Sequence, residues 1–392
     1  MKIAIATYHF YPENTPRAFR AFELAKEFSR QGHQVVVYTA EYDFNYVPVE
    51  KKFGISIRKV KPGFLLNTKA EKYTGAGRNS LDIKSKNFIF GNICKRMLKK
   101  AMVYVYAESI KTEYFFTLFR ALRKDKGKYD LLISNALPFS VHLGCCLALR
   151  TNKNLAKVKT AEYGDPFSLS NYRWEGKYLI RKVWMYLERI ALKKFDFITT
   201  PNRDAAKLFE LFKEKSKIKV IPQGYDFSKI KTAVYKKNDI CTFAYAGIFY
   251  ETIRNPKNLF DFLSGVNLNF RFLIYTKKTN WESLSCIIPY LKRLNEKLVI
   301  CDYLEREKLI YELSKCDFLI NINNATTYQT PSKIIDYALA GRPFFSCSQN
   351  HLDEKRLLNF LDGIYDTSNC NINLEDFDIK NVAASFIELA KQ

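Results

Sequence analysis

The sequence predicts an α/β protein made of two doubly wound domains, and three features point to this class. Short apolar runs that suit buried parallel strands alternate with segments whose apolar residues recur at helical spacing. A threonine–proline pair, which suits the N-cap and first position of a helix, follows an apolar run in each half, at 15–16 and 330–331. Between the halves, residues 223–238 are polar and lysine-rich, which is typical of a linker.

The first half, residues 1–222, is predicted to be the N-terminal domain. Strands are expected near residues 1–7, 34–39, 129–134, 158–162, 195–199 and 219–222. Helices are expected from Pro16 to Gly32, after Pro138, and over residues 178–193.

Residues 83–126 form the most basic stretch and include a predicted amphipathic helix. Four apolar residues recur at a spacing of four, and four basic residues lie beside or opposite them: Ile89, Ile93, Met97 and Ala101, then Lys95, Arg96, Lys99 and Lys100. Such a helix can lie on an anionic membrane with its lysines near the headgroups. It can equally pack on its own sheet, and the sequence leaves both interpretations open.

The second half, residues 239–375, repeats the pattern of strand and helix. Strands are expected at 241–246, 270–275, 297–301, 318–322 and 344–347, with helices from about Lys257, over 306–315 and from 331 to 341. Gly341 suits the left-handed position that ends a helix, and Pro343 prevents its continuation. A last segment, 376–392, follows, with an amphipathic helix expected over 381–391, and the Asp376-Phe377-Asp378 sequence before it suits an N-cap better than a metal site.

Composition narrows the possible partners. The 392 residues are 47% hydrophobic and 26% charged, and no apolar run reaches the ~18 residues that cross a bilayer. Nine cysteines without a CxxC pair or a His/Cys cluster indicate reduced thiols and no metal site. The net charge of +23 suits phosphorylated substrates or an anionic membrane surface. Zinc-finger spacing and RNA-binding aromatic motifs are absent from the sequence, so nucleic acid is the weakest candidate.

The predicted helix at 331–341 is the main candidate for ligand binding. Its N-terminus, capped by Thr330, would present free N–H groups and the positive end of the dipole, to which Ser332 and Lys333 add a hydroxyl and a charge. Asp336 follows one turn later, so a carboxylate lies next to a predicted phosphate site. That order suits a nucleoside diphosphate, although an ordinary capped helix with a solvated Asp336 remains open.

Other candidates follow the ends of predicted strands. In the first half, Asn14 and Thr15 precede the helix on which Arg17 and Arg20 place cations against the dipole. An arriving anion or a solvated basic face explains these arginines equally well.

Two further loops carry candidates. Gly164 allows a tight turn that would hold Asp165 at the carboxyl edge of the sheet, where it would position an acceptor hydroxyl or simply cap a helix. In the second half Gly247 precedes a basic loop with Arg254 and Lys257, an arrangement that suits an anion.

Five stretches in order resemble GT-B glycosyltransferases of the glycosyltransferase family 4 type, particularly bacterial surface-polysaccharide enzymes. They cover nearly the whole chain: YPENTPRAFRAFELAKEFSRQGHQVVVYT, TAEYGDPFS, VIPQGYD, YAGIFYETIRNPKNL and TPSKIIDYALAGRP. The resemblance implies two Rossmann-like domains facing a cleft, with the acceptor bound by the first and the donor by the second.

The resemblance also implies residue roles. Asp336 is similar to the acid that holds the donor ribose, and Ser332 and Lys333 to the diphosphate end of the helix. Arg254 and Lys257 resemble the basic pair that neutralises the leaving diphosphate, and Asp165 or Glu162 lies near an acceptor-side catalytic position.

The chain departs from the family pattern at two positions. The first of two glutamates eight positions apart would lie at residue 328, which is Tyr328, and the basic residue expected after Gly247 is Ile248.

The sequence thus predicts a metal-independent, retaining glycosyltransferase without a cofactor other than its nucleotide-sugar co-substrate. Its acceptor would be lipid-linked or a polysaccharide in capsule or lipopolysaccharide (O-antigen) synthesis. Its location would be cytoplasmic, at the inner face of the plasma membrane. Two alternatives remain open: a nucleotide-sugar epimerase of the same fold, and an inactive GT-B scaffold at the membrane.

Overall fold

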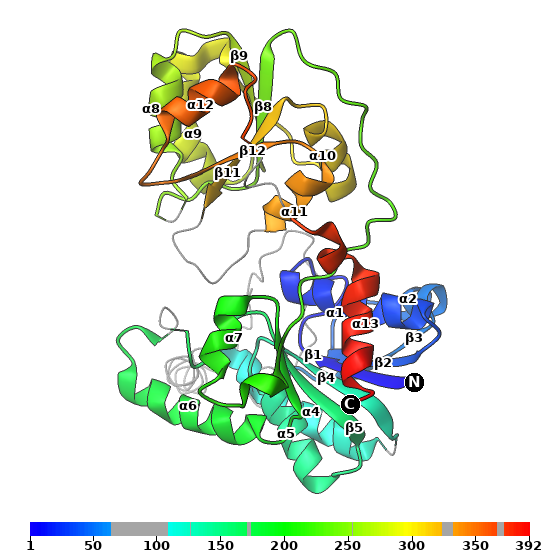
Figure 1. The fold of residues 1–392 in the computed structure, drawn as a ribbon. Coiled ribbons are helices and arrows are strands. Elements are labelled where there is room, and N and C mark those ends of the chain that lie inside the picture. Colours follow the sequence, from blue (N-terminus) through cyan, green and yellow to red (C-terminus); the bar gives the residue numbers. More distant parts are fainter. Residues whose placement is uncertain (64–108, 126, 171–173, 253, 324–331, 367–371) are drawn as a thin grey trace, which may run out of the picture. The chain divides into compact units, whose positions relative to one another are not determined.

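The structure, a computed structural model, describes residues 1–63, 109–125, 127–170, 174–252, 254–323, 332–366 and 372–392. These residues divide into two compact units, one formed by 1–226 with 378–392 and the other by 227–377. Each unit is an α/β domain (Figure 1), and each is described by itself below.

The first unit is built on a seven-stranded parallel sheet with the strand order β3-β2-β1-β4-β5-β6-β7. Its strands are β1 (Lys2–Thr7), β2 (Gln34–Ala40), β3 (Ile55–Val60), β4 (Tyr129–Ala136), β5 (Ala156–Tyr163), β6 (Phe197–Thr200) and β7 (Ile218–Val220). In the interior strand β1, Ile5 pairs with Val37 on one side and Ile133 on the other. The predicted strands of this half are confirmed, because continuous apolar runs identify strands that are buried on both faces.

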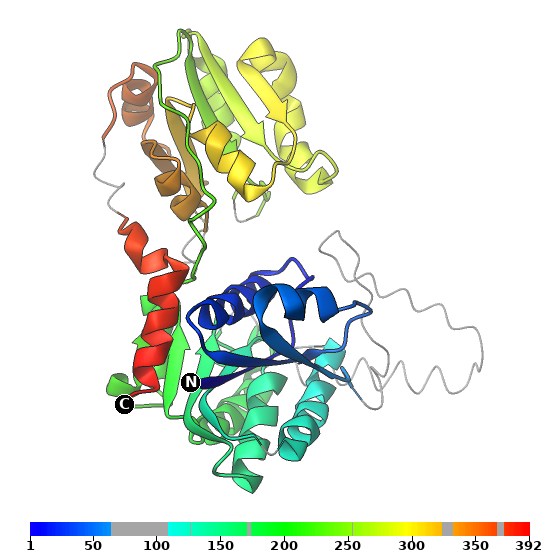
Figure 2. The same ribbon diagram turned by 90° about the vertical axis from the view of Figure 1, so that its right-hand side faces the viewer.

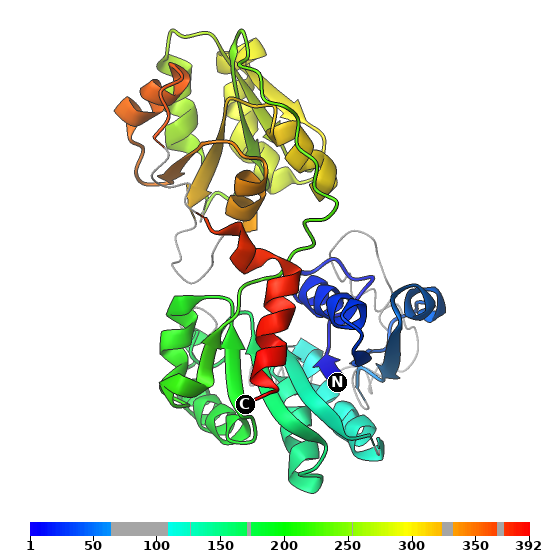
Figure 3. The same ribbon diagram turned by 45° about the vertical axis from the view of Figure 1, so that its right-hand side comes forward.

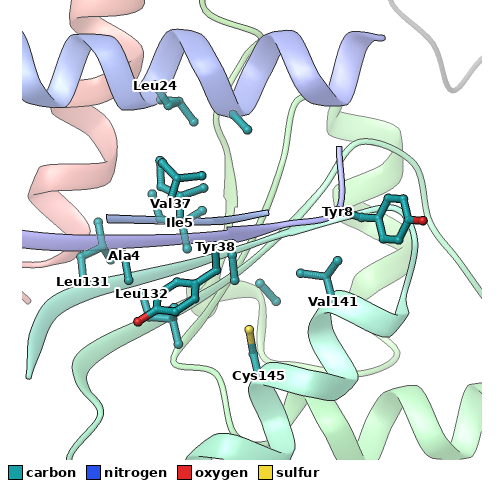
Figure 4. Packing of buried hydrophobic residues seen from close by; sticks show 14 of the residues in the cluster. Ala4, Ile5, Tyr8, Leu24, Val37, Tyr38, Leu131, Leu132, Val141 and Cys145 are labelled. Carbon is teal, nitrogen blue, oxygen red and sulfur yellow. The ribbon is translucent and has the colours of Figure 1, made fainter. Parts of the chain in front are cut away.

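Helices cover both faces of this sheet. They are α1 (Pro16–Arg30), α2 (Val47–Phe53), α4 (Tyr114–Lys124), α5 (Ser140–Thr151), α6 (Tyr178–Leu192), α7 (Arg203–Phe209) and α13 (Ile379–Leu389), with 3₁₀ turns η1 (Ser109–Glu113) and η3 (Lys215–Lys217). Figure 4 shows Leu24 of α1 on one side of the strands, and Val141 and Cys145 of α5 on the other. Their burial with the strand residues forms one continuous core.

The last helix of the chain, α13, belongs to the first unit. Its N-cap is Asp378, whose side chain accepts a hydrogen bond from the Lys380 N–H, as predicted for the Asp-Phe-Asp sequence. Phe386 packs against Phe28 of α1, with ring centroids 6.5 Å apart. Figure 3 shows α13, in red, lying beside α1. The chain therefore returns to its N-terminal unit after completing the second.

The second unit has a five-stranded parallel sheet with the order β10-β9-β8-β11-β12. Its strands are β8 (Cys241–Ala246), β9 (Phe270–Tyr275), β10 (Leu298–Cys301), β11 (Phe318–Asn323) and β12 (Phe344–Ser348). Its helices are α8 (Lys257–Gly265), α9 (Trp281–Leu294), α10 (Arg306–Leu313), α11 (Ser332–Leu339) and α12 (Glu354–Leu361), with 3₁₀ turns η4 (Asn295–Lys297) and η5 (Leu374–Phe377).

Two separate cores show how these helices are layered. One core joins the sheet to α8, α9 and α12, and the other joins it to α10 and α11. Figure 2 shows helices on both faces of this sheet. Both units are therefore doubly wound, and the predicted fold class is confirmed.

The polar segment predicted as a linker is fastened to the second unit. The Tyr235 hydroxyl and the Asn238 N–H both donate to Asp317 Oδ1, at 2.7 and 3.2 Å. The Ala233 N–H donates to Ser314 Oγ at 2.8 Å. Residues from 227 onward are accordingly part of that unit.

No helix within the described ranges is long and apolar enough to cross a bilayer. Most of the predicted basic amphipathic segment, 83–126, lies outside the described residues, which resume at 109.

Candidate functional site

In the first unit, the N-terminus of α1 lies at the carboxyl ends of β4 and β5. Thr15 is the N-cap, and its hydroxyl accepts a hydrogen bond from the Ala18 N–H at 3.3 Å. Arg17 in the first turn donates from Nη1 to Asn135 Oδ1 (3.3 Å), the Ala136 carbonyl (3.2 Å) and Glu162 Oε2 (3.0 Å). These contacts hold the Arg17 guanidinium across two strand ends.

Arg20 lies one turn further along and is buried. Its Nε is 2.7 Å from Glu162 Oε1, and its Nη1 and Nη2 donate to the carbonyls of Pro222 and Ile221 at 2.6 and 3.0 Å. Burial lowers the pKa of the Arg20 guanidinium, and the Glu162 carboxylate opposes that shift. Arg20 therefore ties α1 to the end of the sheet, and its side chain is closed off from solvent.

The two acidic candidates of this unit have different surroundings. Glu162 is fully buried and divides its two carboxylate oxygens between Arg17 and Arg20. Asp165 is exposed, two residues after the end of β5, and Asn14 is exposed as well. Gly164, which stands between Glu162 and Asp165 in the sequence, lies so close to Arg17 that a Cβ at residue 164 would overlap the guanidinium. Glycine at this position permits the close approach.

A titratable cluster near the end of β1 includes His9, a minor candidate from the sequence that could face a cleft or cap a strand end; its partners Glu13, Tyr42 and Lys111 are not predicted from the sequence. His9 Nδ1 lies 2.6 Å from Glu13 Oε2, which also accepts a 2.6 Å hydrogen bond from the Tyr42 hydroxyl. Lys111 Nζ lies 3.4 Å from His9 Nε2. Burial disfavours the Glu13 carboxylate, yet its contacts with His9 and Tyr42 leave the pKa of Glu13 below its ordinary value. The spacing of four between His9 and Glu13 is the one sequence signal for this pair.

In the second unit, Lys333 of α11 reaches the turn that follows β8. Its Nζ donates to the Tyr245 hydroxyl at 2.7 Å, and that hydroxyl donates to the Ile248 carbonyl at 3.1 Å. Gly247 has a φ of +133°, and a Cβ there would overlap the end of the Lys333 side chain. Glycine at this position therefore permits both the backbone conformation of the turn and the close approach of the Lys333 side chain.

Arg254 approaches the same turn from the loop before α8. Its Nη1 donates to the Ile248 carbonyl at 3.3 Å, and its backbone pairs with Tyr250 in an antiparallel bridge. Burial lowers the pKa of the Lys333 ammonium well below its ordinary value, and the nearby Arg254 charge lowers it further. Two cations are thus held close together, which favours an anion at this turn.

Asp336, one turn after Lys333 on α11, pairs with Arg306 at the start of α10. The Arg306 Nε lies 2.7 Å from Asp336 Oδ1, and both side chains are partly exposed. Burial raises the pKa of the Asp336 carboxyl, and Arg306 acts against that shift. Arg306 was not singled out in the sequence, where it reads only as the first residue of a helix.

Some predicted residues are not brought to the Lys333 cluster. Lys257 lies on the exposed side of α8, where its Nζ pairs with Asp261 at 2.6 Å. Thr330 and Tyr328 lie outside the described residues. Ser332 begins α11, and its side chain is not among those described.

A cavity of about 520 Å³ lies along the apolar side of α11 in the second unit. It is lined by Asn323, Ile334, Ile335, Phe344, Ser346, Ile372 and Phe377. Its volume is in the range of small-molecule sites, and its few polar groups suit an uncharged part of a ligand. Among the described side chains, no group of three or more His, Cys, Asp or Glu residues could hold a metal ion.

Comparison with solved structures reveals likeness over the whole chain. Anabaena HepE in complex with UDP-glucose is 10% identical, with a TM-score of 0.59 over 100% of this chain and 99% of that one. The lipopolysaccharide outer core galactosyltransferase WaaB is 10% identical, with a TM-score of 0.55 over 100% and 97%. A Listeria monocytogenes protein assigned as a UDP-N-acetylglucosamine 2-epimerase is 10% identical, with a TM-score of 0.51 over 99% and 94%.

No family model and no curated protein matches the sequence. At such low identities the likeness to crystal structures concerns the fold. The two parallel sheets, each wound on both faces, and the likeness to these proteins over their full length agree with each other. The chain therefore has the GT-B fold, with two Rossmann-like domains.

Proposed function

We propose that this protein is a glycosyltransferase whose second unit binds a nucleotide-sugar donor. The observation that carries the proposal is the convergence of Lys333 and Arg254 on the turn after β8, beside Gly247. Charge develops on the leaving diphosphate during sugar transfer, and fixed cations at that place lower the barrier. The likeness to HepE in complex with UDP-glucose supports a nucleotide-sugar ligand.

The surroundings of Lys333 favour a negatively charged ligand. A buried ammonium beside a second cation is costly, as the lowered pKa of Lys333 reflects. A diphosphate would remove that cost by adding negative charge between the two cations, so relief of this repulsion would contribute to its binding. We therefore assign the basic pair to Lys333 and Arg254, in place of Arg254 and Lys257.

Asp336 is the proposed ribose ligand. Its carboxylate is an acceptor for vicinal hydroxyls, and Arg306 orients it through their 2.7 Å contact. Ser332, the first residue of α11, and Thr330, two positions before it in the sequence, are proposed to contact the diphosphate. The cavity along α11 would take an uncharged part of the donor.

The first unit is proposed to bind the acceptor. Asp165 is exposed at the carboxyl end of β5 and is preferred over Glu162 as the acceptor-side acid, because Glu162 is occupied by two arginines. Asn14, Thr15 and Arg17 would face an anionic part of the acceptor. Arg20 is proposed as a positioning residue for Arg17 through Glu162.

The finer assignment rests on the sequence resemblance. We propose a family 4-like enzyme that retains anomeric configuration without a metal and transfers sugar to a lipid-linked or polysaccharide acceptor. The likeness to WaaB supports lipopolysaccharide or capsule assembly as its setting. Such acceptors lie at the inner face of the plasma membrane, which is where we expect this protein to work.

Calorimetry with UDP-, GDP- and dTDP-sugars tests donor binding. One nucleotide class should bind, and Arg254→Ala and Asp336→Ala should each weaken it. Asp336→Ala should also abolish any preference for the ribonucleotide over its 2′-deoxy analogue, since Asp336 is the proposed hydroxyl ligand. Unchanged affinity in both variants would contradict the proposal.

Two further measurements separate the alternatives. The likeness to an assigned epimerase makes that activity a second candidate, and product analysis without any acceptor would detect an epimerised sugar. An inactive scaffold would bind none of the donors, whereas a transferase should release nucleoside diphosphate when an acceptor extract is supplied.

A further inference from the structure

The exposed side of α6 in the first unit is largely apolar. A helix on the surface of a soluble protein normally turns polar residues outward. On α6 five large apolar side chains are 40–76% exposed: Tyr178, Leu179, Val183, Tyr186 and Leu187. The opposite side of the helix is packed normally, since Trp184 is buried against Phe139 and Phe167. These exposed apolar side chains therefore do not form part of the core of this unit.

The charges on the exposed side of α6 are all basic. Lys182, Arg189 and Lys193 at its end are exposed. The one acidic residue of the helix, Glu188, is fully buried and accepts hydrogen bonds from the Tyr163 hydroxyl and the Ser168 N–H at 2.7 and 3.0 Å. Lys182 Nζ lies 4.6 Å from the Tyr178 ring centroid, so its stem follows the aromatic surface.

These residues form two adjacent stripes along the helix. At 100° per residue, Lys182, Arg189 and Lys193 fall within one narrow sector. Leu179, Val183 and Tyr186 fall within the next sector. Figure 1 shows α6 along the outer side of the first unit. An exposed face with an apolar stripe beside a cationic stripe, and tyrosines at its boundary, has the composition of an interfacial helix.

We propose that this face of α6, defined by Leu179, Val183, Tyr186, Lys182, Arg189 and Lys193, binds an anionic lipid bilayer. The positive charge of this face indicates which partner can bind it. A second copy of this chain, or its own lysine-rich segment 83–126, would bring cations against cations. Anionic headgroups instead match the basic stripe, while the apolar stripe enters the acyl boundary. The proposal rests on the proposed function, because membrane binding would give access to a lipid-linked acceptor. The test of lipid binding does not require that function.

Vesicle flotation of the full chain tests the proposal, with phosphatidylcholine alone and with added phosphatidylglycerol. The protein should float with the anionic vesicles only, and less so at high salt. Since each basic residue near such a surface contributes roughly fivefold in affinity, Lys182→Gln/Arg189→Gln/Lys193→Gln should weaken binding on the order of 100-fold. Lys128→Gln/Lys153→Gln/Lys215→Gln, which removes equal charge from exposed positions elsewhere on this unit, should have a far smaller effect.

The apolar stripe needs its own pair of variants. Leu179→Glu/Val183→Glu should abolish flotation, whereas Leu211→Glu/Val234→Glu, at exposed apolar positions away from α6, should not. Equal loss in the control sets would mean that net charge alone drives binding and would overturn the proposal. If neither α6 variant affected flotation, the membrane contact would lie elsewhere and the proposal would fail. It would also fail if the protein bound no lipid but formed an oligomer that Leu179→Glu/Val183→Glu dissociates, because this face would then be a self-association surface. Donor calorimetry on the same variants should be unchanged, so failure of membrane binding is separable from failure of the proposed function.

Discussion

The Lys333 ammonium lies 2.7 Å from the Tyr245 hydroxyl and 4.1 Å from the centroid of the Tyr245 ring. These contacts fix a long, flexible side chain against the turn after β8 before any ligand binds. Lysine otherwise loses considerable side-chain entropy when it is immobilised on a ligand. Pre-positioning in this way suits Lys333 for holding a diphosphate.

Replacing Lys333 by methionine should weaken binding of the nucleoside diphosphate. The variant keeps the stem of the side chain but removes the charge, and a hydrogen bond to a charged group is worth about 1.5–3 kcal/mol, or roughly 10–100-fold in affinity. Lys257→Met provides the matched control, because Lys257 pairs with Asp261 on the exposed side of α8. Calorimetry with the nucleotide that the wild type binds measures both. A loss confined to Lys257→Met would support the sequence-based assignment of Lys257 instead, and equal losses would assign both lysines to the site.

Gly247→Ala should disrupt the same site from the backbone side. Its φ of +133° is strained for alanine, and the new Cβ would displace the end of Lys333. We expect nucleotide affinity to fall at least as far as in Lys333→Met, with a lower melting temperature. Gly265→Ala is the control, since Gly265 has no close neighbours and ends α8, where alanine is tolerated. Normal affinity in Gly247→Ala would show that Lys333 does not need its observed position.

Local patterns in the sequence were sufficient for much of the fold. The Thr15 and Asp378 caps, the left-handed Gly341 and the buried strands each depend on residues within a few positions of one another. Such features can be predicted because the chain itself determines the neighbours. The repeated order of strand and helix then leads to doubly wound domains.

The partners of the site residues could not be predicted in this way. Arg306 and Asp336 are 30 residues apart, and Arg20 reaches the Ile221 carbonyl across 201 residues. Lys257 shows the same limit, because its sequence position fits a basic loop but the turn of α8 directs it towards Asp261. Side-chain direction depends on tertiary packing, which no spacing rule supplies. The return of α13 to the first unit is a further case.

His142 should make the first unit sensitive to acid. It is fully buried on α5, with Nδ1 2.7 Å from Ser134 Oγ, and burial lowers its pKa from 6.5 to about 3. Below about pH 6.5 the His142 imidazole binds a proton in the unfolded chain, whereas in the folded state it stays neutral until the pH approaches 3. Its contribution to stability is therefore complete above about pH 6.5 and is lost as the pH falls towards 3.

The effect can be isolated by comparing variants at several pH values. In a Trp281→Phe background the remaining tryptophans, Trp174 and Trp184, report on the first unit alone. The free energy of unfolding in urea should decline less steeply with acid in His142→Leu than in the parent, whatever the constant cost of the substitution. His351→Leu, at an exposed position of the second unit, should leave the slope unchanged. Parallel pH profiles for His142→Leu and the parent would argue against a neutral buried imidazole.

Glu162→Gln should destabilise the first unit by about 3–5 kcal/mol, because it leaves the buried Arg20 charge without its counter-ion. Asp165→Asn, exposed near the same strand end, should change the free energy of unfolding by less than ~0.5 kcal/mol. Adding Arg20→Met to Glu162→Gln should restore part of the loss, since the orphaned charge is then removed. Tryptophan fluorescence in urea, in the same Trp281→Phe background, measures all three. If Glu162→Gln instead abolished sugar transfer while unfolding like the parent, Glu162 would be a reacting group and not the anchor of Arg17 and Arg20.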